Sequence, residues 1–241
     1  MKKPAVRNAI YLSIGIIAIG WIQKIFNFLS TKPSLAEQLG LKVKLSENLS
    51  QASLYIVTVG MLTFLLVYYL LKLTNENFGS LGFNKNKLGR QIAIGALFGI
   101  GIFALDTFLI SPILEALLPN AAAEGENIKY LFSNLYYIPI LLFMAIFKGG
   151  FLEEIWRIFV LTRFEKAFKT AGLIFALIFF SAMFGLGHAY QGTSGIISTA
   201  ILGLLNGLVY LRKRNAMEAV TAHAVFDVVA LTLGFILYHG K

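Results

Sequence analysis

Long apolar runs recur along the whole chain, and they constrain the fold more than any other feature. A helix needs roughly 20 mostly apolar residues to cross a bilayer, and the chain holds about seven such stretches. Their approximate limits are 9–28, 52–72, 91–113, 133–162, 172–190, 194–211 and 217–238. The runs are continuous and lack the polar–apolar alternation of a membrane β-barrel. The pattern predicts an all-α, polytopic integral membrane protein.

The composition agrees with this prediction. The chain is 57% hydrophobic and 14% charged, which a soluble surface cannot accommodate. Cysteine is absent, so disulfides, thiol catalysis and thiolate metal sites are excluded. The 21 Lys and Arg against 12 Asp and Glu give a net charge of +9. These cations lie at the ends of apolar runs, which favours contact with membrane lipids, and nucleic acid is not expected as a partner.

The loop charges predict the orientation of the chain. Four basic groups flank the predicted helices: Lys2, Lys3 and Arg7; Lys72, Lys85, Lys87 and Arg90; Arg163, Lys166 and Lys169; and Arg212, Lys213 and Arg214. All four fall on one side of an alternating seven-helix trace, and the acidic loop with Glu115, Glu124 and Glu126 falls on the other. The positive-inside rule then predicts a cytoplasmic N-terminus, in a cytoplasmic membrane of bacterial type.

The most unusual charges lie inside the fourth apolar stretch. The sequence Phe-Lys-Gly-Gly-Phe-Leu-Glu-Glu-Ile-Trp-Arg carries Lys148, Glu153, Glu154 and Arg157. Ionisable groups inside a bilayer cost a few kcal/mol each and mark functional sites. Arg157 can pair with either glutamate at helical spacing, but it neutralises only one. We therefore expect one structural acid and one reactive acid, the latter protonated or held by a partner from another helix.

Two later stretches carry histidines. His188 follows Gly185 and Gly187, small residues that let another helix approach, and His223 lies one helical turn before Asp227. Each signal alone also fits a structural role: an interface histidine, a helix-stabilising pair, or a rim of charge at a helix end. Because three such signals lie on three helices of an apolar protein, we expect them to converge in one site.

Two glutamates, two histidines and an aspartate can bind a divalent metal or activate water directly. No His-Glu-x-x-His and no Gly-x-Ser-x-Gly motif is present. A carboxylate general base with histidine as proton partner or oxyanion donor needs no metal. The residues therefore favour metal-independent chemistry, and we expect no cofactor.

The ordered motifs resemble the CPBP family, which includes CAAX prenyl endopeptidases, bacteriocin-processing or immunity proteins and related intramembrane glutamic proteases. The resemblance lies in three motifs: Glu153-Glu154 followed by Arg157, Phe184 with His188, and His223 with Asp227. It covers roughly residues 75–238. We therefore divide the chain into N-terminal transmembrane helices and a loop at 1–74 and a CPBP-like protease core at 75–241.

The resemblance implies roles for these residues within an all-helical fold around a conical polar cavity. Glu153 is the implied general base that activates water, and His188 helps to polarise that water. His223 and Asp227 correspond to the pair that stabilises the oxyanion. Glu154 and Arg157 correspond to a supporting ion pair.

Two positions depart from the family pattern. The family separates its second glutamate and the arginine by three residues, whereas only Ile155 and Trp156 intervene here. Alignment on Arg157 instead would put Leu152 at the catalytic position, so we align on the two carboxylates. Asp227 stands where asparagine is common. An ionised Asp227 would repel an oxyanion, so we expect it to orient His223 or to be protonated.

These observations favour a membrane peptidase, a glutamic endopeptidase that cuts a peptide bond near or in the membrane. Its partners would be membrane lipids and a peptide or protein substrate, for which lipid modification is one family precedent. Two alternatives stay open. One is a non-catalytic scaffold or immunity protein of the same fold. The other, less favoured because no duplicated halves are visible, is a proton-coupled transporter.

Overall fold

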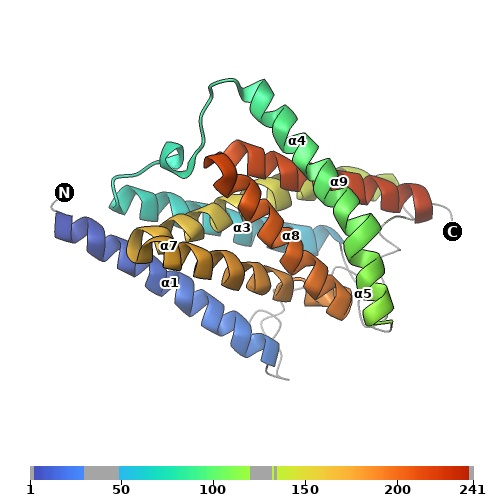
Figure 1. Ribbon diagram of the computed structural model, residues 1–241, viewed down its shortest axis with the longest axis horizontal. Coiled ribbons are helices and arrows are strands. Elements are labelled where there is room, and N and C mark those ends of the chain that lie inside the picture. Colours follow the sequence, from blue (N-terminus) through green and yellow to red (C-terminus); the bar gives the residue numbers. More distant parts are fainter. Residues whose placement is uncertain (1–2, 30–48, 120–131, 133–134, 239–241) are drawn as a thin grey trace.

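The computed structural model describes residues 3–29, 49–119, 132 and 135–238, and these residues form helices and turns without strands (Figure 1). The all-α prediction is therefore confirmed for the described part of the chain. The longer helical elements are α1 (Lys3–Leu29), α3 (Leu49–Leu73), α4 (Leu88–Leu105), α5 (Ser111–Leu117), α6 (Ile138–Phe143), α7 (Glu154–Leu186), α8 (Gly192–Lys213) and α9 (Ala216–Tyr238). Shorter ones are η1 (Phe78–Leu81), η2 (Asp106–Ile110), η4 (Leu135–Tyr137), η5 (Met144–Glu153) and η6 (Ala189–Gln191).

Six helical stretches among the described residues are long and apolar enough to cross a membrane. They are Ala5–Ile22, Leu49–Leu73, Leu88–Leu117, Leu135–Leu186, Ala189–Lys213 and Ala216–Leu237. The protein is therefore a polytopic integral membrane protein, but the predicted count of seven helices is not confirmed. The difference arises in one stretch, Leu135–Leu186, which replaces two of the predicted helices.

The stretch Leu135–Leu186 folds back on itself at Lys169. The backbone of Lys169, with φ 57° and ψ −147°, is not helical. In a straight helix Phe164 and Phe180 would be about 24 Å apart, at about 1.5 Å per residue. Their ring centroids are only 5.3 Å apart. The stretch is therefore a hairpin, and its two arms correspond to the helices predicted over 133–162 and 172–190.

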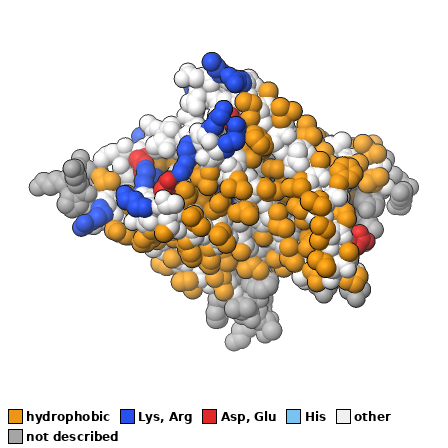
Figure 2. Space-filling view, viewed as in Figure 1, with side chains coloured by type: hydrophobic (Ala, Val, Ile, Leu, Met, Phe, Trp, Pro, Cys, Tyr) orange, Lys and Arg blue, Asp and Glu red, His pale blue; other side chains and the backbone are white. Residues whose placement is uncertain are grey.

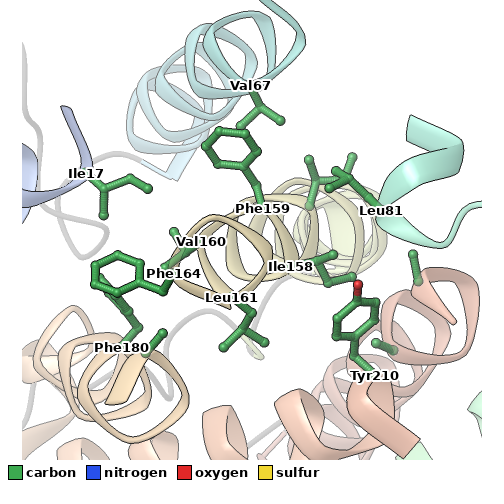
Figure 3. Close-up of a cluster of buried hydrophobic side chains, with 14 of the residues drawn as sticks. Ile17, Val67, Leu81, Ile158, Phe159, Val160, Leu161, Phe164, Phe180 and Tyr210 are labelled. Atoms are coloured by element: carbon green, nitrogen blue, oxygen red, sulfur yellow. The ribbon is translucent and has the colours of Figure 1, made fainter. Parts of the chain in front are cut away.

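The first arm of this hairpin lies at the centre of the helical bundle. Its consecutive residues Ile158, Phe159, Val160 and Leu161 are each at most 1% exposed. A helix that is apolar on every face is buried on every face. Figure 3 shows these side chains directed at residues from five other places in the chain: Ile17 in α1, Val67 in α3, Leu81 in η1, Phe180 in the second arm and Tyr210 in α8. The helix that continues from the Glu153-Glu154 pair is thus held from all sides.

Helices α4 and α9 pack closely because glycines face α9. A Cβ atom at Gly99 would lie 2.5 Å from the carbonyl oxygen of Ala222 and 2.9 Å from Cβ of Val225. A Cβ at Gly95 would lie 2.6 Å from the carbonyl oxygen of Glu218. Small residues let the backbones of membrane helices approach in this way. The contact fixes the position of α9, the helix that carries His223.

Basic segments from distant parts of the chain gather at one end of the molecule. Arg163 and Lys166 both form ion pairs with Glu76, and Arg214 pairs with Glu165. Figure 2 shows lysine and arginine side chains concentrated at this end, beside a broad apolar surface. The clustering agrees with the loop-charge pattern, while the cytoplasmic assignment of this end stays a prediction.

The glycine packing between α4 and α9 predicts different effects at two glycines of one helix. Replacing Gly99 with alanine forces the α9 backbone away, so we expect G99A to cost about 1–3 kcal/mol, as overpacking does. A Cβ atom at Gly101 would have no neighbouring atom within 4 Å, so this glycine serves as the control. We expect G101A to be neutral or to stabilise by about 0.5–1 kcal/mol through helix propensity. Thermal unfolding in detergent measures both, and equal effects would contradict the packing argument.

Candidate active site

A π-helical segment, η5, shapes the charged part of the first hairpin arm. It spans Met144–Glu153, between α6 and α7. In a π-helix the backbone hydrogen bonds join residues five apart. Such segments are rare overall, but those that occur are often found at functional sites. Lys148 and Glu153 are separated by this interval, and Lys148 Nζ lies 2.6 Å from Glu153 Oε1. Glu153, the carboxylate that does not pair with Arg157, is therefore held by a lysine of the same helix. This corrects the expectation of a partner from another helix.

Glu154 lies at the centre of a buried charge network. Its side chain has no exposed surface, and its Oε1 accepts from Arg157 Nε at 3.0 Å. The same oxygen lies 2.8 Å from Nδ1 of His223 in α9. Residues three apart share one face of an α-helix, so the short spacing between Glu154 and Arg157 still allows the ion pair. Arg157 also donates to the carbonyl oxygen of Gly203 at 2.6 Å, which ties α7 to α8.

His223 connects the buried network to the more open side of the cluster. Its Nδ1 faces Glu154, and its Nε2 lies 3.9 Å from Glu153 Oε2 and 3.6 Å from Asp227 Oδ2. The last two distances exceed a direct hydrogen bond and are those of close electrostatic contacts. A carboxylate on Nδ1 fixes the ring and leaves Nε2 directed at Glu153 and Asp227. The hydrogen bond that orients His223 thus comes from Glu154 and not, as expected, from Asp227.

Two consecutive glycines allow α9 to reach the charged segment. A Cβ at Gly149 would overlap Oδ2 of Asp227, and a Cβ at Gly150 would lie 2.5 Å from Cβ of Ala224. A larger residue at Gly150 would push α9 outward, because it would meet Cβ and backbone atoms of that helix, whereas one at Gly149 would displace the Asp227 carboxylate. The sequence interpretation gave this glycine pair no role, although its position beside the charges is the signal that marks it.

Phe184 joins the remaining histidine to the network. Its ring centroid lies 4.7 Å from that of His188 and 5.9 Å from that of His223. The Arg157 guanidinium lies 4.4 Å from the same ring, within the range of a cation–π contact. Nδ1 of His188 lies 2.9 Å from the carbonyl oxygen of Phe184, so this nitrogen donates and Nε2 stays free to act as an acceptor.

His188 lies at a helix end that α8 approaches closely. Helix α7 ends at Leu186, and Gly187 caps it. A Cβ at Gly185 would overlap the carbonyl oxygen of Ile196 in α8, as expected for a small residue at a helix contact. His188 interacts electrostatically with Glu153 and with His223. The structure therefore brings His188 to the same cluster as the Glu153-Glu154 pair.

All six residues predicted for the site lie in this cluster: Glu153, Glu154, Arg157, His188, His223 and Asp227. Lys148 joins them as a residue that the motifs do not include. Over the described ranges, no three His, Asp or Glu side chains are arranged to hold a metal ion. The arrangement offers a partly exposed carboxylate, an oriented imidazole and two cations, the groups that water activation and oxyanion stabilisation require.

The fold and the cluster define an integral membrane protein with an intramembrane carboxylate–histidine site. Residues 134–229 match the family model described as type II CAAX prenyl endopeptidase Rce1-like. The match contains every residue of the cluster, and it confirms the resemblance to the CPBP/CAAX protease family over this segment. It supports a CAAX-type intramembrane peptidase that acts on a protein or peptide. Searches of curated proteins and of solved structures find no match to this chain.

The match does not test how the chain divides. It begins at residue 134, well after the predicted boundary at 74/75, so the division into 1–74 and 75–241 stays a prediction. The conical cavity implied by the family resemblance also stays a prediction.

The buried Glu154 network predicts a large loss of stability when its cation is removed. In R157M the carboxylate of Glu154 loses its ion pair in a solvent-free position, so we expect a loss of about 3–5 kcal/mol. The exposed Arg90 is the control, and R90M should change stability by less than about 0.5 kcal/mol. Adding E154Q to R157M should restore part of the loss. Unfolding in detergent measures all four proteins, and similar losses in R157M and R90M would rule out a buried network.

Proposed function

We propose that the protein is a glutamic intramembrane endopeptidase of CAAX type, in which Glu153 activates the water that attacks a peptide bond. The observation that carries the proposal is the contrast between the two neighbouring glutamates. Glu154 is fully buried and engaged with Arg157 and His223, whereas the Glu153 side chain is 21% exposed. Two adjacent carboxylates in different environments suit one structural and one reactive role. The contrast also supports alignment on the two glutamates rather than on Arg157.

Glu153 would act as general base and then as general acid. It accepts a proton from water while the water oxygen attacks the carbonyl carbon of the peptide. The resulting tetrahedral intermediate carries its negative charge on the former carbonyl oxygen. When it collapses, the carbon–nitrogen bond breaks and Glu153 returns the proton to the departing amine. His188, close enough to interact with Glu153, would help to hold and polarise the water.

His223 would stabilise the developing oxyanion. Its Nδ1–H donates to Glu154, so Nε2 can donate to an oxyanion only when the ring is the doubly protonated imidazolium, the form that the facing carboxylates of Glu153, Glu154 and Asp227 favour. Donors positioned before the reaction lower its barrier without the cost of reorganisation. The orienting role thus falls to Glu154, as an aspartate plays it in the serine protease triad. Asp227, at 3.6 Å from Nε2, would modulate the charge of this imidazole.

The proposal extends to metal independence and to the partners. Metal independence is supported because Glu153 and Glu154 already have Lys148 and Arg157 as counter-ions. The substrate would be a peptide or protein in the membrane, and a lipid-modified chain is the class that the family description suggests. We also propose that the basic end lies in the cytoplasm of a bacterial-type membrane, with the N-terminus on that side.

Cleavage of a peptide library, prenylated members included, by the purified protein in liposomes tests the proposal. We expect E153Q to lower kcat by at least about 1,000-fold, because the general base and its charge are both lost. E153A, H188A and H223A should also lose cleavage. E165Q is the matched control, since Glu165 pairs with Arg214 at the basic end, and it should cleave normally. Wild-type inactivity across the library would favour a non-catalytic scaffold.

Metal independence has its own test. We expect cleavage to persist after dialysis against a strong chelator, because both attacking and stabilising groups are side chains of the protein. Unfolding midpoints with and without chelator control for loss of structure. Inactivation that added zinc reverses, without a change in the midpoint, would show that the water is activated by a metal.

A further inference from the structure

Lys148 is the member of the cluster that the family motifs leave without a role. Its Nζ lies 2.6 Å from Glu153 Oε1, and its side chain is 27% exposed. It also interacts electrostatically with Asp227 and with Tyr190. The neighbouring Gly149 lies directly against Oδ2 of Asp227. Lys148 therefore lies at the contact between the η5 segment and α9, on the side that Glu153 faces.

The π-helix is what brings this lysine to the glutamate. At 100° per residue, an α-helix would place residues five apart about 140° away from each other around the axis. The wider π-turn places them on one face. A rare backbone geometry over Met144–Glu153 thus creates the Lys148–Glu153 pair. In an α-helix of the same sequence, Glu153 would lose this counter-ion.

Lys148 supplies one of the two permanent positive charges of the cluster. Glu153, Glu154 and Asp227 supply three carboxylates, against the two permanent cations Lys148 and Arg157. Arg157 is committed to Glu154. Lys148 therefore faces two carboxylates, Glu153 and Asp227, which lie 3.9 Å and 3.6 Å from the same nitrogen of His223. In a medium of low dielectric, such unbalanced charge is costly.

We propose that Lys148 is a positioning residue that serves as the shared counter-cation of Glu153 and Asp227. It holds the Glu153 carboxylate in place for water activation and offsets the charge of an aspartate beside the oxyanion position. The cluster then needs Lys148 because residue 227 is an aspartate and adds a negative charge. With a neutral asparagine there, the cluster would carry one negative charge fewer and would depend less on the lysine. The catalytic part of this inference rests on the proposed peptidase function.

A double-mutant cycle in the cleavage assay tests this coupling. We expect K148M to lower kcat by about 100-fold while KM changes by less than about 3-fold, because the lysine acts on the base and not on binding. K148R keeps the charge and should stay within about 10-fold of wild type. D227N should lower the activity of the wild type, yet raise that of K148M by at least about 10-fold. Additive effects of the two changes would overturn the proposal.

The same double-mutant cycle, measured by thermal unfolding, tests the charge compensation independently of cleavage. We expect K148M to lower the unfolding midpoint by at least about 4 °C, and D227N to restore at least half of that loss in the K148M background. K85M, at an exposed lysine outside the cluster, is the control and should leave the midpoint unchanged. If K148M does not accumulate, K148Q replaces it in both cycles.

The outcomes separate this inference from the proposed function. If wild-type protein cleaves nothing, the peptidase proposal fails, and the unfolding cycle still decides whether Lys148 is the shared counter-cation. If wild-type protein cleaves and E153Q does not, but both cycles are additive, the inference about Lys148 is wrong and the peptidase proposal stands.

Discussion

The structure depends on the carboxylate of Glu154, which is buried away from water. Glu154 has no exposed surface, and such a group is tolerated only when cations and hydrogen-bond donors surround it. Arg157 and His223 provide them, and Arg157 reaches on to the Gly203 carbonyl oxygen. This single oxygen-centred network therefore ties α7 to both α8 and α9. Each of these three helices contributes a group to the network. The network therefore also determines which side chains lie beside Glu153.

Close helix contacts make that network possible. Glycines at 95, 99, 149 and 150 allow α9 to approach both α4 and the η5 segment, and Gly185 allows α8 to approach α7. In lipid, apolar surface alone gives little reason for helices to associate, so close packing and polar contacts must hold them together. The same contacts that stabilise the bundle place His223 and Asp227 beside Glu153. Stability and site geometry thus have one structural origin.

The sequence was sufficient to predict the class of fold and the members of the candidate site. Apolar run length predicts membrane helices because the bilayer sets their length, and charges inside such runs stand out because they are costly. The reversal at Lys169 lies between the helices predicted over 133–162 and 172–190, because Arg163, Lys166 and Lys169 interrupt the apolar run there. The Lys148–Glu153 pair, by contrast, does not follow from the sequence. Helical spacing rules assume α-geometry, and residues five apart do not meet under that rule.

The π-helix explains why a local change of backbone has consequences for chemistry. Within this segment residues five apart share one face, so Lys148 turns toward Glu153, while Glu154 keeps its α-helical relation to Arg157. The two glutamates consequently receive different cations from opposite directions along one helix. Neighbouring residues of the same type then differ in burial and in partners, which is how adjacent carboxylates come to have separate roles. The two ion pairs lie on either side of the change from π to α: five-residue spacing pairs Lys148 with Glu153 in the π-helix, and three-residue spacing pairs Glu154 with Arg157 in the α-helix.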